Sequence, residues 1–280
     1  MRRLSVLLVL LASACTENQT PPPDHLPYGD GGTLPPLTCV PNLDGQIAAS
    51  ELQAALGVPA NYLVSPAGEE RPVDLAGTVD AAGHRLWDWS AYAESDRRLT
   101  LTASVVTDKW YAASFPTGQF TTALDAAQTL QAVYRQDAEQ MLLLGIASTE
   151  PAPPEGKTLI VYDPPVVLYR FPLAVGASWV SVGNVANATI RGLPYAARDT
   201  YEVSIDAAGR MELPDLGFAQ ALRVRTKVTT APAAGQSVTR WQVSFLFECF
   251  GEIARATSRD NEQNADFTTA AEVRRFGLTQ

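Results

Sequence analysis

Oxygen-bearing side chains between residues 42 and 51 have a spacing that could bind a cation. Asn42, Asp44 and Glu51 fit three ligand positions of a calcium loop, and Gly45 stands where such a loop turns sharply. The first ligand position would be Val40, whose side chain has no oxygen. The alternative is an Asp-Gly turn that leads into a short helix. We expect no metal ion and no cofactor, and calcium at Asn42, Asp44 and Glu51 stays open as the alternative.

The residues for acid-base or nucleophilic catalysis are sparse. His84 is the one histidine after residue 38, and Asp88 follows it four residues later. The sequence has no Gly-x-Ser-x-Gly turn for a nucleophile and no glycine-rich phosphate-binding motif. A single histidine also excludes most catalytic zinc sets. We expect a protein that is not an enzyme and name no catalytic residue. A hydrolase that uses paired carboxylates, which needs no histidine, remains an alternative.

Two cysteines are candidates for a disulfide. Cys39 and Cys249 are the cysteines that follow Cys15, and a bond between them would close a loop of about 210 residues. In the chain-entropy model such a crosslink contributes about 3–5 kcal/mol to stability. The alternative is two buried thiols.

Aromatic residues offer two candidate binding surfaces. Trp241, Phe245 and Phe247 stand at alternate positions and would share one face of a strand, either lining a ligand cavity or packing in the core. A second group could form an exposed patch for a sugar or a partner, or belong to the core: Trp87, Trp89, Trp110 and Tyr111.

The elements that must position these residues are mostly strands. Apolar and polar residues alternate with a period of two at 99–105, 201–206, 222–229 and 241–249. This alternation predicts antiparallel strands with one face toward solvent. Further strands are predicted at 85–89, 109–115, 131–135, 141–146, 158–162, 166–171 and 178–182, and short helices at 48–56 and 122–130.

The predicted fold class is therefore mainly β, with a curled antiparallel sheet, half-barrel or sandwich-like, and one or two short helices. Residues 39–280 are expected to form a single domain. The hollow of a curled sheet must contain something apolar, either a helix of the protein or a ligand.

Residues 160–257 contain a recurring set of turn and strand signals. A Pro-Leu-x-x-Gly-x-x-Trp segment runs from Pro172 to Trp179, and a strand beginning at Tyr201, a proline turn at 214–218 and an aromatic strand at 241–251 follow it. In these features the segment resembles exported bacterial proteins of unknown function. The resemblance implies a β architecture and no particular activity.

The first residues have the pattern of an export signal. Arg2 and Arg3 precede an apolar run of eight residues, 4–11, and small residues lead to Cys15. A membrane-spanning helix needs about 20 apolar residues, so this run is too short to span a bilayer. The segment resembles a bacterial lipoprotein signal. That resemblance implies removal of residues 1–14, a diacylglyceryl group on Cys15 and, with Thr16 next, an outer-membrane destination.

Residues 15–38 would connect that anchor to the domain. Six prolines lie between residues 16 and 38, a composition that favours an extended tether. Loss of Arg2 and Arg3 leaves 19 basic against 30 acidic residues, a net charge of −11. Phosphates repel such a chain, which argues against a nucleic-acid partner. Attachment to the membrane would then depend on the lipid at Cys15.

These observations give three functional hypotheses. The first is a lipid-anchored protein of the bacterial cell envelope with a non-enzymatic structural or partner-binding role. The second is a carrier or sensor of an apolar ligand that occupies the hollow of the curled sheet. The third is the hydrolase with paired carboxylates.

Overall fold

The computed structural model describes residues 39–278. The predictions for the signal segment 1–14, for lipidation of Cys15 and for the tether 15–38 lie outside this range and stay predictions. The mainly β fold class is confirmed, because strands make up the regular structure and the helices of the described residues are single 3-10 turns. None of the helices in this range is long and apolar enough to span a bilayer.

The longest strands lie in the second half of the described chain. The first half of the described chain contains β1 (Gln46–Ile47), η1 (Ala49–Glu51), β2 (Pro59–Val64), β3 (Arg71–Pro72), β4 (Thr78–Val79), β5 (Arg85–Asp88), β6 (Arg97–Thr102), β7 (Ser104–Val105), η2 (Ala112–Ser114), β8 (Phe120–Ala123), β9 (Leu130–Gln136) and β10 (Gln140–Ser148). The second half contains β11 (Leu159–Arg170), β12 (Leu173–Ala174), β13 (Ser178–Ile190), β14 (Leu193–Glu212), β15 (Gly217–Pro232), β16 (Val238–Phe247), β17 (Gly251–Thr257), β18 (Thr269–Ala270) and β19 (Glu272–Phe276).

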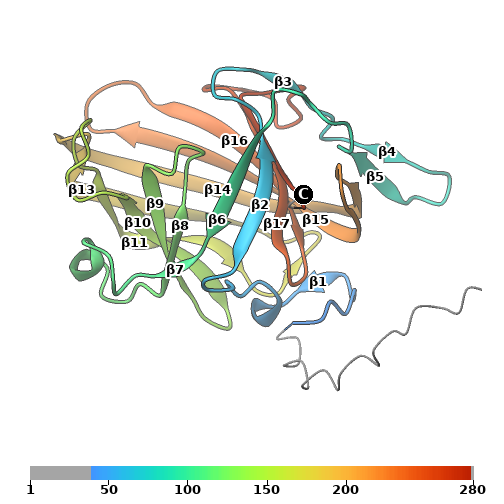
Figure 1. Ribbon diagram of the computed structural model, residues 1–280, viewed down its shortest axis with the longest axis horizontal. Coiled ribbons are helices and arrows are strands. Elements are labelled where there is room, and N and C mark those ends of the chain that lie inside the picture. The colour runs from blue at the N-terminus through green and yellow to red at the C-terminus, as the bar shows by residue number, and fades with distance from the viewer. Residues whose placement is uncertain (1–38, 279–280) are drawn as a thin grey trace, which may run out of the picture. The chain divides into compact units, whose positions relative to one another are not determined.

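One large sheet curls until it is nearly closed (Figure 1). From β7 to β19 its main strands pair antiparallel with their neighbours in the chain, and β19 then pairs with β2, where Arg274 lies opposite Val64. The strand order begins at β6 and ends at β7, which are consecutive parts of residues 97–105. Ala103 separates the two parts and bridges to Leu56. A single stretch of chain therefore joins the two ends of the sheet.

Bulges help the long strands to bend. The pairing of β14 with β15 shifts register between Ile205 and Ala207 and again between Gly209 and Met211. A bulge bends its strand and increases the local twist. Because β14 spans 20 residues, these bends let it contribute to the curl while keeping its hydrogen bonds.

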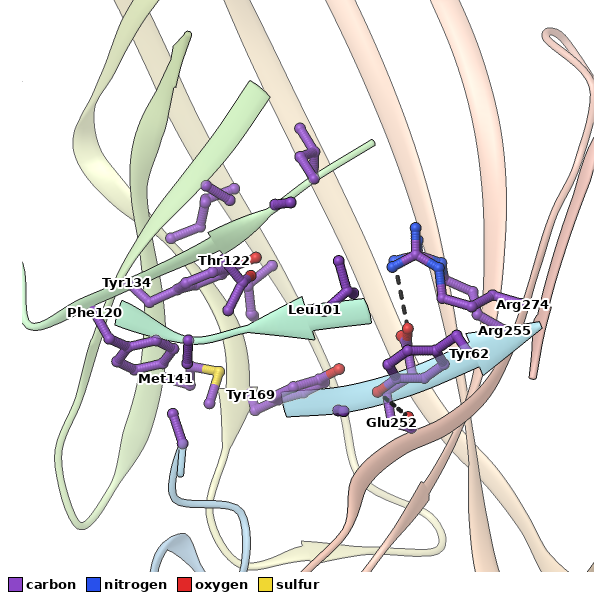
Figure 2. A pocket seen from close by; sticks show the side chains of 18 of the residues that line it. Tyr62, Leu101, Phe120, Thr122, Tyr134, Met141, Tyr169, Glu252, Arg255 and Arg274 are labelled. Atoms are coloured by element: carbon purple, nitrogen blue, oxygen red, sulfur yellow. Dashed lines mark hydrogen bonds and ion pairs between the residues drawn. The ribbon is translucent and has the colours of Figure 1, made fainter. Parts of the chain in front are cut away.

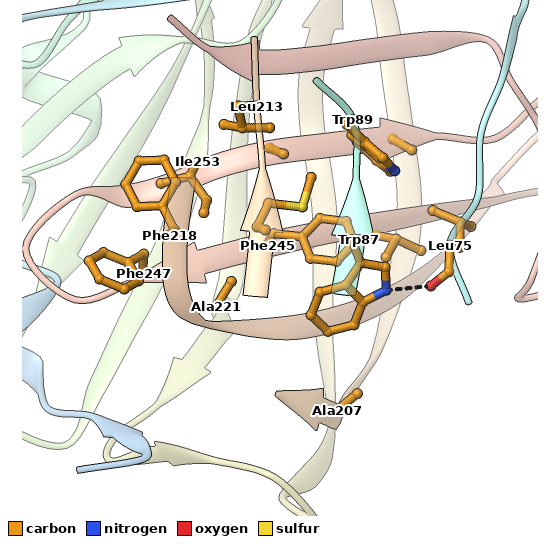
Figure 3. Close-up of a cluster of buried hydrophobic side chains, with 14 of the residues drawn as sticks. Leu75, Trp87, Trp89, Ala207, Leu213, Phe218, Ala221, Phe245, Phe247 and Ile253 are labelled. Atoms are coloured by element: carbon orange, nitrogen blue, oxygen red, sulfur yellow. Dashed lines mark hydrogen bonds between the residues drawn. The ribbon is translucent and has the colours of Figure 1, made fainter. Parts of the chain in front are cut away.

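An aromatic core covers part of the outer face of the sheet (Figure 3). Phe245 of β16 contacts two tryptophans near β5, with ring centroids 4.8 Å from Trp87 and 5.1 Å from Trp89. The Trp87 indole N–H donates a 3.0 Å hydrogen bond to the Leu75 carbonyl. The segment that contains β3, β4 and β5 thus shields this part of the sheet from solvent.

Because the segment with β3, β4 and β5 covers this part of the sheet, one expectation from the alternating pattern is wrong here: the polar face of the strand does not face solvent. Arg223 and Arg225 belong to the polar face of β15, yet each is only 6% exposed. Both guanidinium groups contact the Asp206 carboxylate, Arg223 through Nε at 2.8 Å and Arg225 through Nε at 2.6 Å. The arginines can be buried because they keep a charged partner.

Local predictions were wrong at three segments. The helix predicted at 48–56 shortens to the 3-10 turn η1. The helix predicted at 122–130 is instead strand β8 and a turn, because Thr122 pairs with Ala132 of β9. The strand predicted at 109–115 contains η2, where the Phe115 amide bonds the Ala112 carbonyl. In these three segments, pairing with neighbouring strands and local turns outweigh the intrinsic helix or strand propensity of the residues. The other predicted strands are confirmed.

Candidate functional site

The hollow of the curled sheet contains a cavity of about 590 Å³. The cavity is lined by side chains of strands β2 and β19, whose pairing closes the sheet. Side chains of strands on the far side of the curled sheet also line it. One wall is apolar and includes Phe120 and Met141, whereas the opposite wall carries Glu252, Arg255 and Arg274 (Figure 2). The cavity is amphipathic, and no helix of the described residues fills it.

A bulge places two charged residues of β17 on the inner face. The pairing of β16 with β17 shifts register between Phe245 and Leu246, opposite residues 252–254. Ile253 and Ala254 are both fully buried in the outer aromatic core. Glu252 and Arg255, three positions apart, therefore both line the cavity.

Hydrogen bonds hold Glu252 in place. Its Oε2 accepts a 2.7 Å bond from the Ser244 hydroxyl, and its backbone carbonyl accepts a 3.0 Å bond from the Tyr62 hydroxyl. Burial, followed by the nearby Glu252 charge, raises the pKa of Tyr62 to about 12. Tyr62 is therefore a neutral hydrogen-bond donor at neutral pH.

Arg255 and Arg274 form three long ion pairs with Glu252 and with Glu272, which pairs with both arginines but does not itself line the cavity. Arg255 lies 3.5 Å from Glu252 and 3.3 Å from Glu272, and Arg274 lies 3.4 Å from the same Glu272 oxygen. Charge-assisted N–H···O hydrogen bonds are usually about 2.7–2.9 Å long. The four charges balance in number, but the two carboxylates only partly satisfy the two guanidinium groups.

Both guanidinium groups have an unpaired donor. The Nε atoms of Arg255 and Arg274 are buried and have no hydrogen-bond partner among the described residues. The Arg274 side chain is only 4% exposed and lies over the Tyr62 ring, 5.8 Å from its centroid. Burial and then repulsion from Arg255 lower the pKa of Arg274.

Three tyrosines add phenol groups to the lining of the cavity. Tyr134, Tyr169 and Tyr201 line the cavity, and burial raises the pKa of each phenol. The Tyr134 ring stacks on Phe120, with centroids 5.2 Å apart. Neutral phenols present an aromatic surface together with a polar hydroxyl, which suits a ligand with both characters.

Exposed apolar side chains mark where the cavity meets solvent. Val58, Leu124 and Phe250 all line it and are 58%, 37% and 47% exposed. Single exposed apolar residues are common, but these three all line the same cavity. Their position suits the entry of an apolar molecule.

The predicted disulfide between Cys39 and Cys249 is present and lies beside the cavity. The two Cα atoms are 5.5 Å apart, and Cys249 is one of the lining residues. Buried Glu248 accepts hydrogen bonds from the Asn42 amide at 2.6 Å and the Leu43 amide at 2.9 Å. The disulfide and Glu248 together attach the segment that contains β1 and η1 to the turn between β16 and β17.

The oxygens of the calcium candidates Asn42, Asp44 and Glu51 accept backbone hydrogen bonds. Asn42 Oδ1 accepts from the Asp44 amide at 2.9 Å, and Asp44 Oδ1 accepts from the Gln46 amide at 2.8 Å. Glu51 Oε2 accepts from the Ala48 amide at 2.8 Å. These hydrogen bonds are typical of the alternative to a calcium loop, which is an Asp-Gly turn that leads into a short helical segment. Within residues 39–278, no cluster of three or more His, Cys, Asp or Glu side chains is arranged to hold a metal ion.

The other candidates lie away from the cavity. His84 is exposed in the β4–β5 turn and pairs with Asp80, not Asp88, at 3.2 Å. Phe245 and Phe247 belong to the outer core, and Trp241 packs against it. The tryptophans and the tyrosine of the proposed exposed patch are buried or half-buried: Trp87, Trp89, Trp110 and Tyr111.

Sequence reasoning missed the residues that build the polar wall. Arg274 lies in a segment for which no strand was predicted, because neither face of strand β19 keeps one chemical character: Glu272, Arg274 and Phe276 share one face, and Val273 and Arg275 share the other. No protein family, no curated protein and no solved structure was found to match this chain.

Proposed function

We propose that this protein is a non-enzymatic binding protein that carries an apolar small molecule in the hollow of its curled sheet. The observation that carries the proposal is the cavity of about 590 Å³ with an apolar wall. Small-molecule sites typically have volumes of about 300–1,000 Å³ and are lined mainly by apolar and aromatic groups with a few polar ones. Of the sequence hypotheses, the carrier or sensor fits this cavity best.

The charges of the cavity favour binding over hydrolysis. Among the described residues that line the cavity, Glu252 is the one carboxylate, and it is hydrogen-bonded to Ser244 and paired with Arg255. Hydrolysis by paired carboxylates needs two acidic groups on either side of the reacting bond. A single paired carboxylate supports a role in shaping the site.

The proposed location follows from the sequence. Lipid chains on Cys15 would hold the protein at the bacterial cell envelope, with the outer membrane as the destination, and residues 16–38 would connect the anchor to the domain. An acidic domain gains little from anionic headgroups, so the anchor would provide the attachment. A carrier held beside a membrane could exchange an apolar molecule with it.

Native mass spectrometry of the full chain with Cys15→Ala tests the proposal. We expect protein that carries a noncovalent small molecule, which organic solvent releases and which N-phenyl-1-naphthylamine displaces with a rise in probe fluorescence. A protein with no added mass, to which the probe does not bind, would contradict the proposal. That result would favour the structural or partner-binding role instead.

A further inference from the structure

The polar wall of the cavity has more hydrogen-bond donors than acceptors. A guanidinium group has five N–H donors and no acceptor. Arg255 and Arg274 each have a buried Nε without a partner in residues 39–278, and both rely on the same oxygen of Glu272 for a further contact. A buried donor without a partner is unfavourable, so the wall is suited to receive an acceptor.

The charge at Arg274 is also incompletely balanced. Burial and the neighbouring Arg255 charge both disfavour its protonated form, and the three ion pairs of the wall are 3.3–3.5 Å long. An added anion would oppose this repulsion. A carboxylate would supply two acceptor oxygens in a planar geometry that matches the guanidinium fork.

The opposite wall of the cavity indicates the chemical character of the rest of the ligand. Phe120 and Met141 pack among apolar neighbours at that side, with Leu101 between them and the charged residues (Figure 2). An acceptor group at the arginines would therefore be attached to an apolar body that lies along these side chains.

We infer that the ligand is a long-chain monocarboxylate, whose head accepts hydrogen bonds from Arg255 and Arg274 and whose hydrocarbon chain lies against Phe120 and Met141. This inference rests on the proposed function and specifies its ligand class. Recognition of the head requires the planar N–H groups of arginine, beyond a positive charge alone.

Competition binding to the delipidated full chain with Cys15→Ala tests the inference. Dodecanoic acid, its methyl ester and dodecan-1-ol share one chain and differ in the head group. Each would be titrated against bound N-phenyl-1-naphthylamine at about pH 8, where the free acid is ionised. We expect the acid to compete at least about tenfold more strongly than the alcohol, since hydrogen bonds to charged groups have about this effect. The ester, an acceptor without charge, should fall between them.

A variant of Arg274 tests whether this residue causes the preference for the acid over the alcohol. Arg274→Lys keeps the charge but loses Nε and the planar fork, and we expect the preference for acid over alcohol to fall to about threefold or less, while alcohol binding is retained. The matched control is Arg259→Gln, which removes an exposed guanidinium group that pairs with Glu70 at the surface. It should leave all three affinities unchanged.

The outcomes separate the inference from the proposed function. Equal competition by the acid, ester and alcohol would overturn the inference and support the apolar carrier. No binding by any of the three, or by the probe, would overturn both. If Arg274→Lys is unfolded by circular dichroism, the acid-to-alcohol ratio of the protein with native Arg274 still decides the head-group preference.

Discussion

Cys39 and Cys249 are 210 positions apart in the sequence, yet a disulfide brings their Cα atoms within 5.5 Å. The bond joins the first described residue to the turn between β16 and β17. Next to it, the Cys249 amide donates a 2.7 Å hydrogen bond to the Glu51 carbonyl. The N-terminal segment is therefore attached to the edge of the cavity by covalent and backbone contacts together.

Replacing both cysteines, Cys39→Ser and Cys249→Ser, should lower the free energy of unfolding by about 3–5 kcal/mol. The reason is the freedom that an unfolded chain regains when so large a loop is opened. Urea unfolding monitored by tryptophan fluorescence measures the change. Reductant should lower the stability of the native protein to a similar extent and leave the double variant unaffected. An unchanged midpoint of native protein in reductant would contradict the prediction.

Trp87→Ala should destabilise the protein by about 3–5 kcal/mol, because it leaves a cavity in the outer core and removes the hydrogen bond to Leu75. Val180→Ala is the control, since Val180 is 60% exposed and its truncation should change stability by no more than about 0.5 kcal/mol. Binding of N-phenyl-1-naphthylamine, measured under conditions in which both variants are folded, should be the same for Trp87→Ala and Val180→Ala. Loss of binding in folded Trp87→Ala would show that the outer core and the cavity are coupled.

Ala60→Phe should block the cavity. Ala60 of β2 lines the cavity, so a phenyl ring there would occupy ligand space, and we expect binding of N-phenyl-1-naphthylamine to weaken about tenfold or more. The matched control is Ala186→Phe, which adds the same ring at an exposed position of β13. Fluorescence titration of both variants gives the comparison. Equal probe affinities in the two folded variants would place the binding site elsewhere.

Asp206→Asn should lower stability at neutral pH by about 1–3 kcal/mol. Loss of one partner from a fully buried ion pair costs about 3–5 kcal/mol, but Asp206 is 35% exposed, so solvent reduces the effect. Burial alone would raise its pKa, but bonds and charges from Arg223 and Arg225 outweigh burial and hold the pKa below its usual value. The stabilisation is complete above the unfolded-state pKa of about 3.9 and disappears as pH falls through the lower folded-state pKa.

Urea unfolding across pH measures this dependence. The difference in stability between the native protein and Asp206→Asn should be constant from neutral pH down to about pH 5 and should shrink at lower pH. A difference that grows with acidity would have the wrong sign for a carboxylate with a lowered pKa.

Cys15→Ala should release the protein from the membrane as a folded, soluble form or trap its uncleaved precursor, because a lipid on Cys15 is the proposed attachment. Fractionation of cells followed by intact-mass measurement separates the two forms. A variant that remained tightly membrane-bound after proper cleavage would contradict lipid anchoring through this residue.

The strands could be predicted where each face of the sheet keeps one chemical character. Tyr201 and Val203 face the hollow while Glu202 and Ser204 face outward, so the alternation is visible in the sequence. The predicted helix at 122–130 failed because Thr122 pairs with Ala132, a contact that depends on a neighbouring strand. Propensity within a short window cannot include that partner.

The polar wall could not be predicted because it depends on register. Glu252 and Arg255 would lie on opposite faces of a regular strand, and the bulge opposite Phe245 and Leu246 brings them to the same side. Arg274 reaches the wall only because β19 pairs with β2, nearly the whole described chain away. Neither relationship has a local signal in the sequence.

The pairing of β19 with β2 also sets an order for folding. The pairing of β2 with β6 and the pairings from β7 to β17 join strands that are closer together in the chain, so they can form as synthesis proceeds. Strand β2 is made long before its partner Glu272–Phe276. Until that strand arrives, the sheet has two open edges, which are the places where strands of different molecules can join. Strand β19 therefore covers both of these edges when it pairs with β17 and β2, as well as completing the cavity.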